Sequence, residues 1–143
     1  MASTSEHRLR RRVQFHEVDS AGIVHFSWFF RYMEEAEHAL WRAAGLSIAP
    51  PGGAIAFPRV STSFDFHSPL RFEDEFDVLI RITAISEKTI RYTCVITRGD
   101  LRIATGTMIA ACVRVVSGQP MKAVPIPQAI VDRFSIATPS EAS

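Results

Sequence analysis

The feature that most constrains the fold is that only one segment of this chain carries a long helical pattern. From about Ser27 to Ala44, apolar residues recur at steps of three and four, which is the spacing of a helix with one buried face. Counted from the residue just before the segment, these positions are Phe26, Phe29, Met33, Ala36, Leu40 and Ala44. The first half of the segment is apolar on nearly every side. We therefore expect a sheet, a second subunit or both to cover the front end of this helix.

The other long segments follow a period of two, which is typical of strands. They are Arg8 to Phe15, Phe57 to Phe66, Phe76 to Ile85, Thr89 to Thr97 and Ile103 to Val116. Turn-forming residues separate the last four segments, which predicts an antiparallel sheet. One strand, one helix and then four strands define an α+β domain, in which the helix covers most of one face of the sheet. A short helical piece that ends near Phe134 is expected after Pro125 and Pro127.

Length and composition set the class of protein. The chain has 143 residues, of which 47 % are hydrophobic and 22 % charged, so we expect one domain over residues 1–136 and a disordered tail over residues 137–143. The net charge of +1 gives no reason to expect nucleic acid or a membrane as the main partner. No apolar run approaches the roughly 20 residues of a membrane helix, and no signal peptide is recognisable. A cytoplasmic protein is expected.

Reactive side chains converge at the turn before the helix. Asp19 lies a few residues upstream of the helix N-terminus, where unpaired N–H groups and the helix dipole suit a carbonyl oxygen that becomes an oxyanion. A carboxylate beside such donors can attack an acyl carbonyl or accept a proton from attacking water. Phe26, Trp28 and Phe29 offer an apolar wall for an acyl group, and Gly22 permits close backbone approach. The residues alone fit equally well a turn that Asp19 merely shapes.

The segment from Phe15 to Gly45 resembles the 4-hydroxybenzoyl-CoA thioesterase family of hotdog proteins. It reads FHEVDSAGIVHFSWFFRYMEEAEHALWRAAG. The family signature is a strand, an aspartate, two variable residues, a glycine and an aromatic residue or histidine before a helix that contains tyrosine and glutamate. The matching residues here are Asp19, Gly22, His25, Tyr32 and Glu34 or Glu35. Two later segments, 64–78 and 124–134, resemble the family's second strand with its acidic turn and its terminal helix.

The resemblance implies a hotdog fold, in which a five-stranded antiparallel sheet wraps around one long central helix. It also implies hydrolysis of an acyl-coenzyme A thioester without a cofactor. Asp19 would be the catalytic carboxylate, as nucleophile or as general base, and the backbone N–H of His25 would polarise the thioester carbonyl. Several relatives carry tyrosine where this chain has His25, whose imidazole can bind the substrate, bind Asp19 or serve only the structure. The family's shared active site implies a homodimer or a homotetramer.

The resemblance also implies contacts with the coenzyme A phosphates and with the acyl group. Lys88, between the third and fourth strands, aligns with a basic segment that holds coenzyme A phosphates in the family, and Arg91 is a weaker candidate. The stretch that contains Ser61 and Thr62 resembles the strand that lines the family's acyl pocket. Only alternate residues of that strand should face the pocket.

Other chemistries find less support in the residues. Glu34 or Glu35 would be a catalytic acid on the helix, but a glutamate at such a position is more often solvated or hydrogen-bonded. No established zinc or iron spacing matches the turn, so no metal is expected. The ligand-type residues of that turn are His16, Glu17, Asp19 and His25.

The two cysteines and the serines offer no nucleophile. Cys94 and Cys112 lie in strand-like segments and are expected to be buried free thiols. The chain contains no G-x-S-x-G elbow of a serine hydrolase.

Two alternatives to an acyl-CoA thioesterase remain open. One is a non-catalytic hotdog module that binds acyl-CoA, although such a module has no need of a carboxylate aimed at the thioester. The other is a thioesterase for an acyl carrier protein, whose acidic surface would require a positive patch near the pocket. Four arginines of the first strand allow such a patch: Arg8, Arg10, Arg11 and Arg12.

Overall fold

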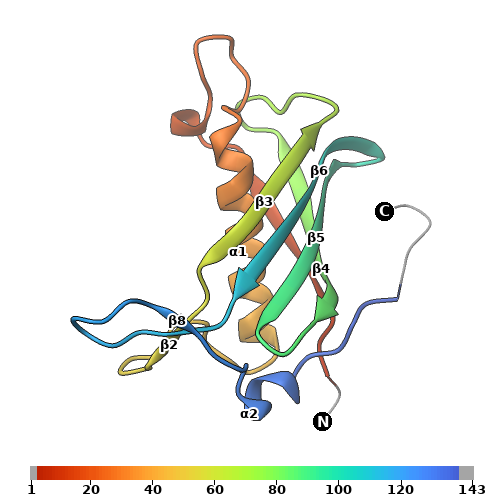
Figure 1. Cartoon of the computed structure of the whole chain (residues 1–143). Helices are drawn as coiled ribbons and strands as arrows, with labels where there is room; N and C mark the ends of the chain where they lie inside the picture. The colour runs from red at the N-terminus through yellow and green to blue at the C-terminus, as the bar shows by residue number, and fades with distance from the viewer. Residues whose placement is uncertain (1–2, 139–143) are drawn as a thin grey trace.

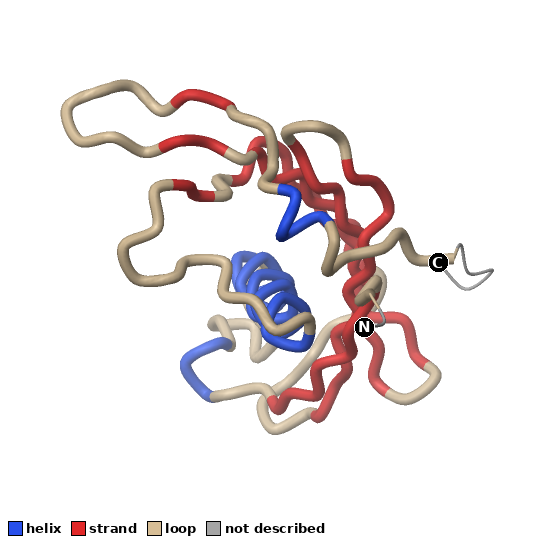
Figure 2. Tube along the Cα trace, turned by 90° about the horizontal axis from the view of Figure 1, so that it is seen from below, coloured by secondary structure: helices blue, strands red, loops and turns tan. Residues whose placement is uncertain are grey.

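The computed structural model describes residues 3–138 and places one long helix against one antiparallel sheet (Figures 1 and 2). The helix, α1, spans Ser27–Ala43. The sheet has the order β1-β4-β5-β6-β3, so β1 and β3 form its edges. Its strands are β1 (Glu6–Arg12), β3 (Arg59–Phe66), β4 (Glu75–Ile85), β5 (Thr89–Arg98) and β6 (Leu101–Ala111). Figure 2 views α1 nearly end-on, with the sheet curving along its side, and the predicted five strands and single long helix are confirmed.

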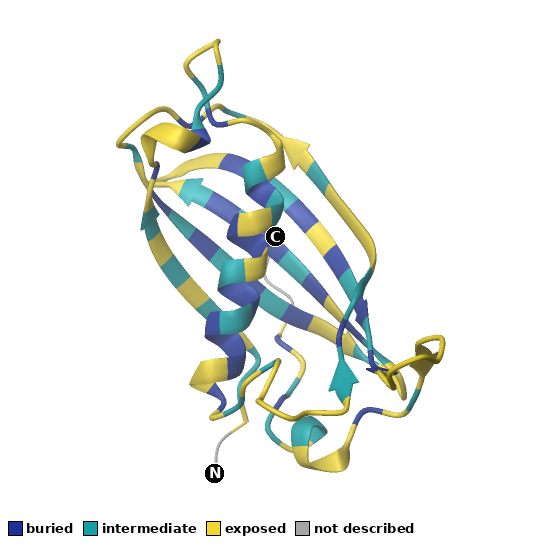
Figure 3. Cartoon of the chain, turned by 90° about the vertical axis from the view of Figure 1, so that its left-hand side faces the viewer, coloured by how far each residue is buried: buried dark blue, intermediate teal, exposed yellow. Residues whose placement is uncertain are grey.

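The core lies between α1 and the face of the sheet that points toward it (Figure 3). Alternate residues of β4, such as Val78, Ile80 and Ile82, are fully buried, as a strand with one covered face requires. From the helix, Tyr32 and Leu40 are equally buried. Full burial of one such aliphatic side chain contributes about 1.5–3 kcal/mol, so this single layer of contacts fixes how α1 lies on the sheet.

Two predicted strands have different ends in the structure. The first ends at Arg12, because Phe15–Glu17 forms a 3₁₀ turn, η1, instead of continuing the strand. The last predicted strand, Ile103 to Val116, is divided at Cys112. The Cys112 N–H donates to the Lys88 carbonyl oxygen at 2.7 Å and so connects the chain to the β4–β5 turn. Beyond that point β7 (Val113–Arg114) pairs with β2 (Ile55–Ala56) and β8 (Lys122–Ala123) in a small second sheet, which the sequence did not predict.

The C-terminal segment returns to the core. The predicted short helix is α2, Gln128–Val131, and it ends three residues before Phe134. The Phe134 ring packs 5.1 Å from the Trp41 ring, between centroids. Ala137 is buried and its N–H donates to the Ile82 carbonyl oxygen at 2.8 Å, so contacts with the domain continue to this residue. Residues 139–143 of the predicted tail lie outside the described residues.

The front end of α1 is covered only in part by its own sheet. Phe29 and Tyr32 are buried, but Trp28 and Phe30 are only half-buried, and Phe26 just before the helix is 60 % exposed. Apolar surface therefore remains around the start of the helix. Within residues 3–138 neither helix combines the length and the apolar character that a bilayer span requires.

A buried carboxylate lies near the middle of α1. Glu37 is fully buried and accepts a hydrogen bond from Arg59, which also contacts Glu34 at 3.3 Å. The Tyr92 hydroxyl beside Glu37 accepts a hydrogen bond from Trp41 Nε1 at 3.0 Å. Burial raises the pKa of Glu37 to about 7, although Arg59 and Tyr92 act in the opposite direction. The carboxyl group therefore remains partly protonated in the folded protein at neutral pH.

This shift makes the stability depend on pH. The folded-state pKa is higher than the unfolded one, so the native state binds more protons between pH 4.5 and 7, and the free energy of unfolding falls as pH rises through that range. We expect a fall on the order of a few kcal/mol, which Glu37→Gln should largely remove. Chemical denaturation at pH 4.5 and pH 8 measures it. Glu34→Gln, which removes the exposed partner of the same arginine, should keep the wild-type pH dependence; loss of that dependence in Glu34→Gln alone would contradict the assignment.

Candidate active site

The turn between η1 and α1 is a tight hairpin of the main chain. Val18 and Val24 form an antiparallel bridge, the Asp19 N–H donates to the Ile23 carbonyl oxygen at 2.9 Å, and the Gly22 N–H donates to the Asp19 carbonyl oxygen at 2.9 Å. Gly22 has φ +81°, a left-handed conformation that glycine adopts without strain. A Cβ atom at this position would meet no atom within 4 Å. Gly22 is therefore required for the shape of the turn rather than for space around it.

Asp19 lies on the wall of a pocket of about 510 Å³ at this end of the helix. Its Oδ1 accepts a hydrogen bond from the Ala21 N–H at 2.8 Å, which orients the carboxylate from within the turn. Most of the other lining residues are apolar, and two polar ones, His67 and Ser68, come from the loop after β3. The apolar lining residues are Ile23, Val24, Phe26, Phe29, Phe66 and Pro69. Two of the predicted wall residues, Phe26 and Phe29, are thus beside Asp19.

The aromatic wall of the pocket has a second row behind it. The Phe29 ring lies 5.1 Å from the Phe66 ring and 6.0 Å from the Phe64 ring, both in edge-on geometry. Phe64 in turn lies directly over Gly106 of β6, where an added Cβ would stand only 2.7 Å from the Phe64 ring. The wall can therefore pack only because position 106 has no side chain.

The predicted oxyanion donor is not free. The His25 N–H donates to the Glu17 carbonyl oxygen at 2.9 Å, and this bond holds the two sides of the hairpin together. His25 also caps the helix, since its carbonyl oxygen accepts from the Trp28 N–H at 3.0 Å and its Nδ1 from the Ser27 N–H at 3.3 Å. The expectation that the His25 N–H polarises the substrate was therefore wrong, because the backbone already uses that donor.

The next amide along the chain, the N–H of Phe26, is not engaged in this way. Among the hydrogen bonds that the structure gives for residues 3–138, none involves the N–H of Phe26 as donor. Phe26 follows His25 directly, and it lines the pocket together with Asp19. The free donor at the start of the helix is thus one residue later than the sequence predicted.

Three other predicted substrate contacts lie outside this pocket. Trp28 packs against the His16 ring, with centroids 5.2 Å apart, instead of against the pocket. Thr62 faces the helix but lines a separate hollow with Phe30 and Glu34. Ser61 precedes Thr62 on β3 and is exposed, and alternation along the strand places it on the opposite face.

Lys88 lies at the other end of the molecule. It is in the β4–β5 turn, whereas the Asp19 hairpin contacts the loop before β4 through a bridge between Ile23 and Arg71 (Figure 1). The 11 residues of β4 separate the two places, and at about 3.3 Å per residue this is roughly 35 Å. One subunit therefore does not bring Lys88 to Asp19.

The rival groups are engaged in structural contacts. Glu34 pairs with Arg59 at 3.3 Å, and Glu35 pairs with Arg11 at 2.7 Å, so neither glutamate reaches the pocket of Asp19. Within residues 3–138 no group of three or more histidine, cysteine or acidic side chains could hold a metal ion. Both cysteines are buried and free, and burial raises the pKa of the Cys94 thiol to about 12.

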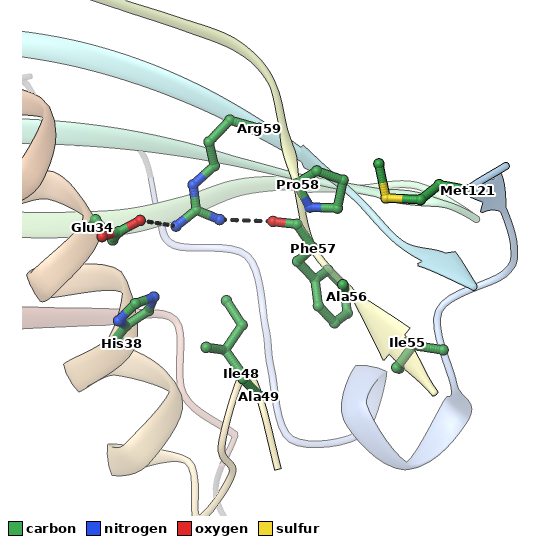
Figure 4. Close-up of a pocket in the computed structure, with 10 residues that line it drawn as sticks. All are labelled: Glu34, His38, Ile48, Ala49, Ile55, Ala56, Phe57, Pro58, Arg59 and Met121. Atoms are coloured by element: carbon green, nitrogen blue, oxygen red, sulfur yellow. Dashed lines mark hydrogen bonds and ion pairs between the residues drawn. The ribbon is translucent and has the colours of Figure 1, made fainter. Parts of the chain in front are cut away.

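A second hollow, of about 460 Å³, lies beside the C-terminal half of α1 (Figure 4). Glu34, His38 and Arg59 form its polar side, and apolar residues of the segments around β2 form the other. Arg59 is held there by Glu34 and by the Phe57 carbonyl oxygen at 2.9 Å, as the dashed lines in Figure 4 indicate. Its guanidinium is therefore committed to protein partners.

The sequence reasoning missed two groups near Asp19. His67 was not recognised because it lies in a loop 48 positions further along the chain, and no pattern connects it with the turn. Glu17 was considered only as a metal ligand, yet it is fully buried. Its place two residues before Asp19, among polar residues of a turn, gives no signal of burial in the sequence.

Comparison with known proteins identifies the family of this chain. A family model described as the thioesterase-like superfamily matches residues 13–134. The 1,4-dihydroxy-2-naphthoyl-CoA hydrolase of Synechococcus elongatus is 23 % identical over 135 residues, which are 92 % of this chain and 97 % of that protein.

Two solved structures are similar throughout. A 1,4-dihydroxy-2-naphthoyl-CoA thioesterase from Synechocystis superposes with a TM-score of 0.79 and 26 % identity, covering 89 % of this chain and 96 % of that one. A variant of 4-hydroxybenzoyl-CoA thioesterase, solved with 4-hydroxybenzoyl-CoA, superposes with a TM-score of 0.80 and 19 % identity, covering 92 % and 99 %. The predicted hotdog fold and the resemblance seen in residues 15–45 are confirmed.

Proposed function

The chain belongs to the thioesterase-like superfamily, and we propose that it hydrolyses an aromatic acyl-coenzyme A thioester to the free acid and coenzyme A. The observation that carries this proposal is the carboxylate of Asp19 on the wall of an otherwise largely apolar pocket. Such a pocket accepts a flat apolar acyl group, and the aromatic wall of Phe29 and Phe66 suits a ring. Relatives named as hydrolases of a dihydroxynaphthoyl-CoA support an aromatic substrate.

Asp19 supplies the chemistry. As nucleophile, its carboxylate attacks the thioester carbonyl carbon and expels the thiolate of coenzyme A, and water then hydrolyses the resulting anhydride. As general base, it removes a proton from water that attacks the same carbon. Both routes require the carboxylate to lie beside the carbonyl, and its hydrogen bond from the Ala21 N–H favours one orientation.

The Phe26 N–H is the donor that we propose for the carbonyl oxygen. It lies at the N-terminal end of α1, where the helix dipole favours developing negative charge. This N–H has no hydrogen-bond acceptor within residues 3–138, whereas the His25 N–H is held by the Glu17 carbonyl oxygen. The pocket then offers an attacking group and an oxyanion donor from residues seven positions apart.

A second copy of the chain completes the binding of coenzyme A in this proposal. Phe15, Phe26, Phe66 and Phe72 remain 48–73 % exposed around the pocket end of the subunit, which is much apolar surface for a free monomer. Lys88 is too distant to serve the pocket of its own subunit, so its contact with the phosphates requires a homodimer or a larger homo-oligomer.

Asp19→Asn tests the catalytic role. Asparagine keeps the side-chain oxygen that accepts from Ala21, so the fold should persist, while kcat should fall about 10²–10⁴-fold, the usual contribution of a positioned acid–base group. Thiol release from a panel of aromatic and aliphatic acyl-CoAs measures the rate. Glu34→Gln serves as the matched control and should retain turnover. Turnover near wild type in Asp19→Asn, with a loss in Glu34→Gln, would move the chemistry to the helix. An acyl-CoA-binding module would bind these substrates without releasing thiol at all.

The Phe26 N–H can be removed without a change of backbone. Phe26 has φ −55°, which proline adopts, and proline is tolerated at the start of a helix. Phe26→Pro removes both ring and donor, whereas Phe26→Ala removes the ring only. We expect kcat of Phe26→Pro to lie about 10²–10³-fold below that of Phe26→Ala, as for the loss of one oxyanion donor. Equal kcat values in the two variants would show that this amide does not take part.

Lys88→Ala tests the contact with the phosphates. The contact is remote from the reacting bond and equally strong in ground and transition states, so KM should rise a few-fold with kcat unchanged. The effect should shrink as salt is added, and it should vanish for an N-acetylcysteamine thioester, which has no phosphate. Equal damage with both substrates would indicate a role of Lys88 in the fold or the subunit interface.

A further inference from the structure

We propose that Glu17 is a positioning residue that fixes the Asp19 hairpin relative to α1, a role that rests on the proposed function of Asp19. Glu17 is the last residue of η1, two positions before Asp19, and it is fully buried. It does not line the pocket, so it does not touch the substrate. Its contribution to the reaction would come through the turn that it holds.

The Glu17 carboxylate joins three elements. It accepts a hydrogen bond from the Tyr32 hydroxyl of α1 at 2.8 Å and another from the Gln14 N–H at 2.8 Å, just before η1. Arg11 of β1 lies 2.8 Å from its second oxygen as an ion pair. All three hydrogen-bond donors, including Arg11 Nη1 at 3.0 Å, reach Oε1, whereas Oε2 has the ion pair with Arg11 but no hydrogen bond within residues 3–138. A buried carboxylate held by charged and neutral donors is more rigid than an exposed one. The helix, the first strand and the start of the turn thus meet at one side chain.

The main chain of Glu17 continues this connection toward Asp19. Its carbonyl oxygen accepts from the His25 N–H, which closes the base of the hairpin, and the Val18–Val24 bridge and the Asp19 N–H to Ile23 bond follow directly. His25 also caps α1 immediately before Phe26. Glu17 therefore fixes the positions of both groups. The Asp19 carboxylate is on one side of the hairpin, and the proposed oxyanion donor, the Phe26 N–H, follows the other side.

The charges around Glu17 favour this arrangement. Arg11 contacts two carboxylates, Glu17 and Glu35, and lies over the Tyr32 ring at 4.8 Å. Burial lowers the pKa of Arg11, but the two carboxylates outweigh it and keep the pKa above its usual value. Burial and the neighbouring Glu17 raise the pKa of Tyr32, so its hydroxyl stays protonated and donates.

The chain offers a matched pair of variants. Glu17→Gln and Glu35→Gln each remove one carboxylate from Arg11, but only Glu17 is also bonded to the hairpin. In Glu17→Gln the amide faces Arg11 with a donor of its own, so the carboxamide must turn and the hairpin loses its fixed position. We expect kcat to fall about 10–100-fold with KM changed less than about threefold, since a displacement near 1 Å of a reacting group costs up to about 10²-fold. Glu35→Gln should keep kcat within about twofold.

Tyr32→Phe provides a second measurement if Glu17→Gln does not fold. It keeps the ring, which packs 4.8 Å from the Phe76 ring, and removes only the donor to Glu17. A fall in kcat of about three- to tenfold at nearly constant KM would support the role, and an unchanged kcat would overturn it.

Three outcomes with the carboxylate pair would also overturn the role: equal effects of Glu17→Gln and Glu35→Gln, a change in KM alone, or no change. Asp19→Asn, assayed in parallel, separates this proposal from the proposed function. If Asp19→Asn is inactive while Glu17→Gln is normal, only the positioning role fails. If Asp19→Asn turns over like the wild type, the proposed function fails as well.

Discussion

The apolar face of α1 has only one sheet to pack against, and the arrangement of the whole domain depends on that contact. Alternate residues of β4 and β5 are buried beneath the helix, so neither the rotation of α1 nor its position along the strands can change without exposing them. The start of the helix is thereby held at the end of the sheet where β4 begins, next to the loop before that strand. The turn that precedes α1 must close over this end of the sheet, and Asp19 of this turn lines the pocket there.

Ion pairs join α1 to both edges of the sheet in the same manner. Arg11 of β1 contacts the half-buried Glu35 and the buried Glu17, while Arg59 of β3 contacts the exposed Glu34 and the buried Glu37. The two buried carboxylates have different surroundings. Glu17 receives donors from Tyr32 and the main chain besides its arginine, whereas burial dominates at Glu37 and raises its pKa to about 7. The carboxylate with several hydrogen-bond donors therefore lies at the Asp19 end of the helix, and the carboxylate with the raised pKa lies away from it.

The sequence could predict what depends on local pattern. Periodicity located α1 and the strands, and the spacing of Asp19 and Gly22 located the turn. The sequence could not predict which backbone N–H groups are free. The His25 N–H is bonded to the Glu17 carbonyl oxygen, and this contact exists only in the folded hairpin. The burial of Glu17 was hidden for a similar reason, since its partners come from a strand and a helix. Lys88 was placed by resemblance alone, which carries no information about distance within one subunit.

The glycine beneath the aromatic wall has a consequence for how such a protein diversifies. Phe64 lies between Gly106 on one side and Phe29 on the other, so a methyl group at position 106 would push the ring toward the pocket. The residue at position 106 touches neither Asp19 nor the pocket itself. The width of this pocket can therefore vary through one substitution in β6, while the Asp19 hairpin stays unchanged.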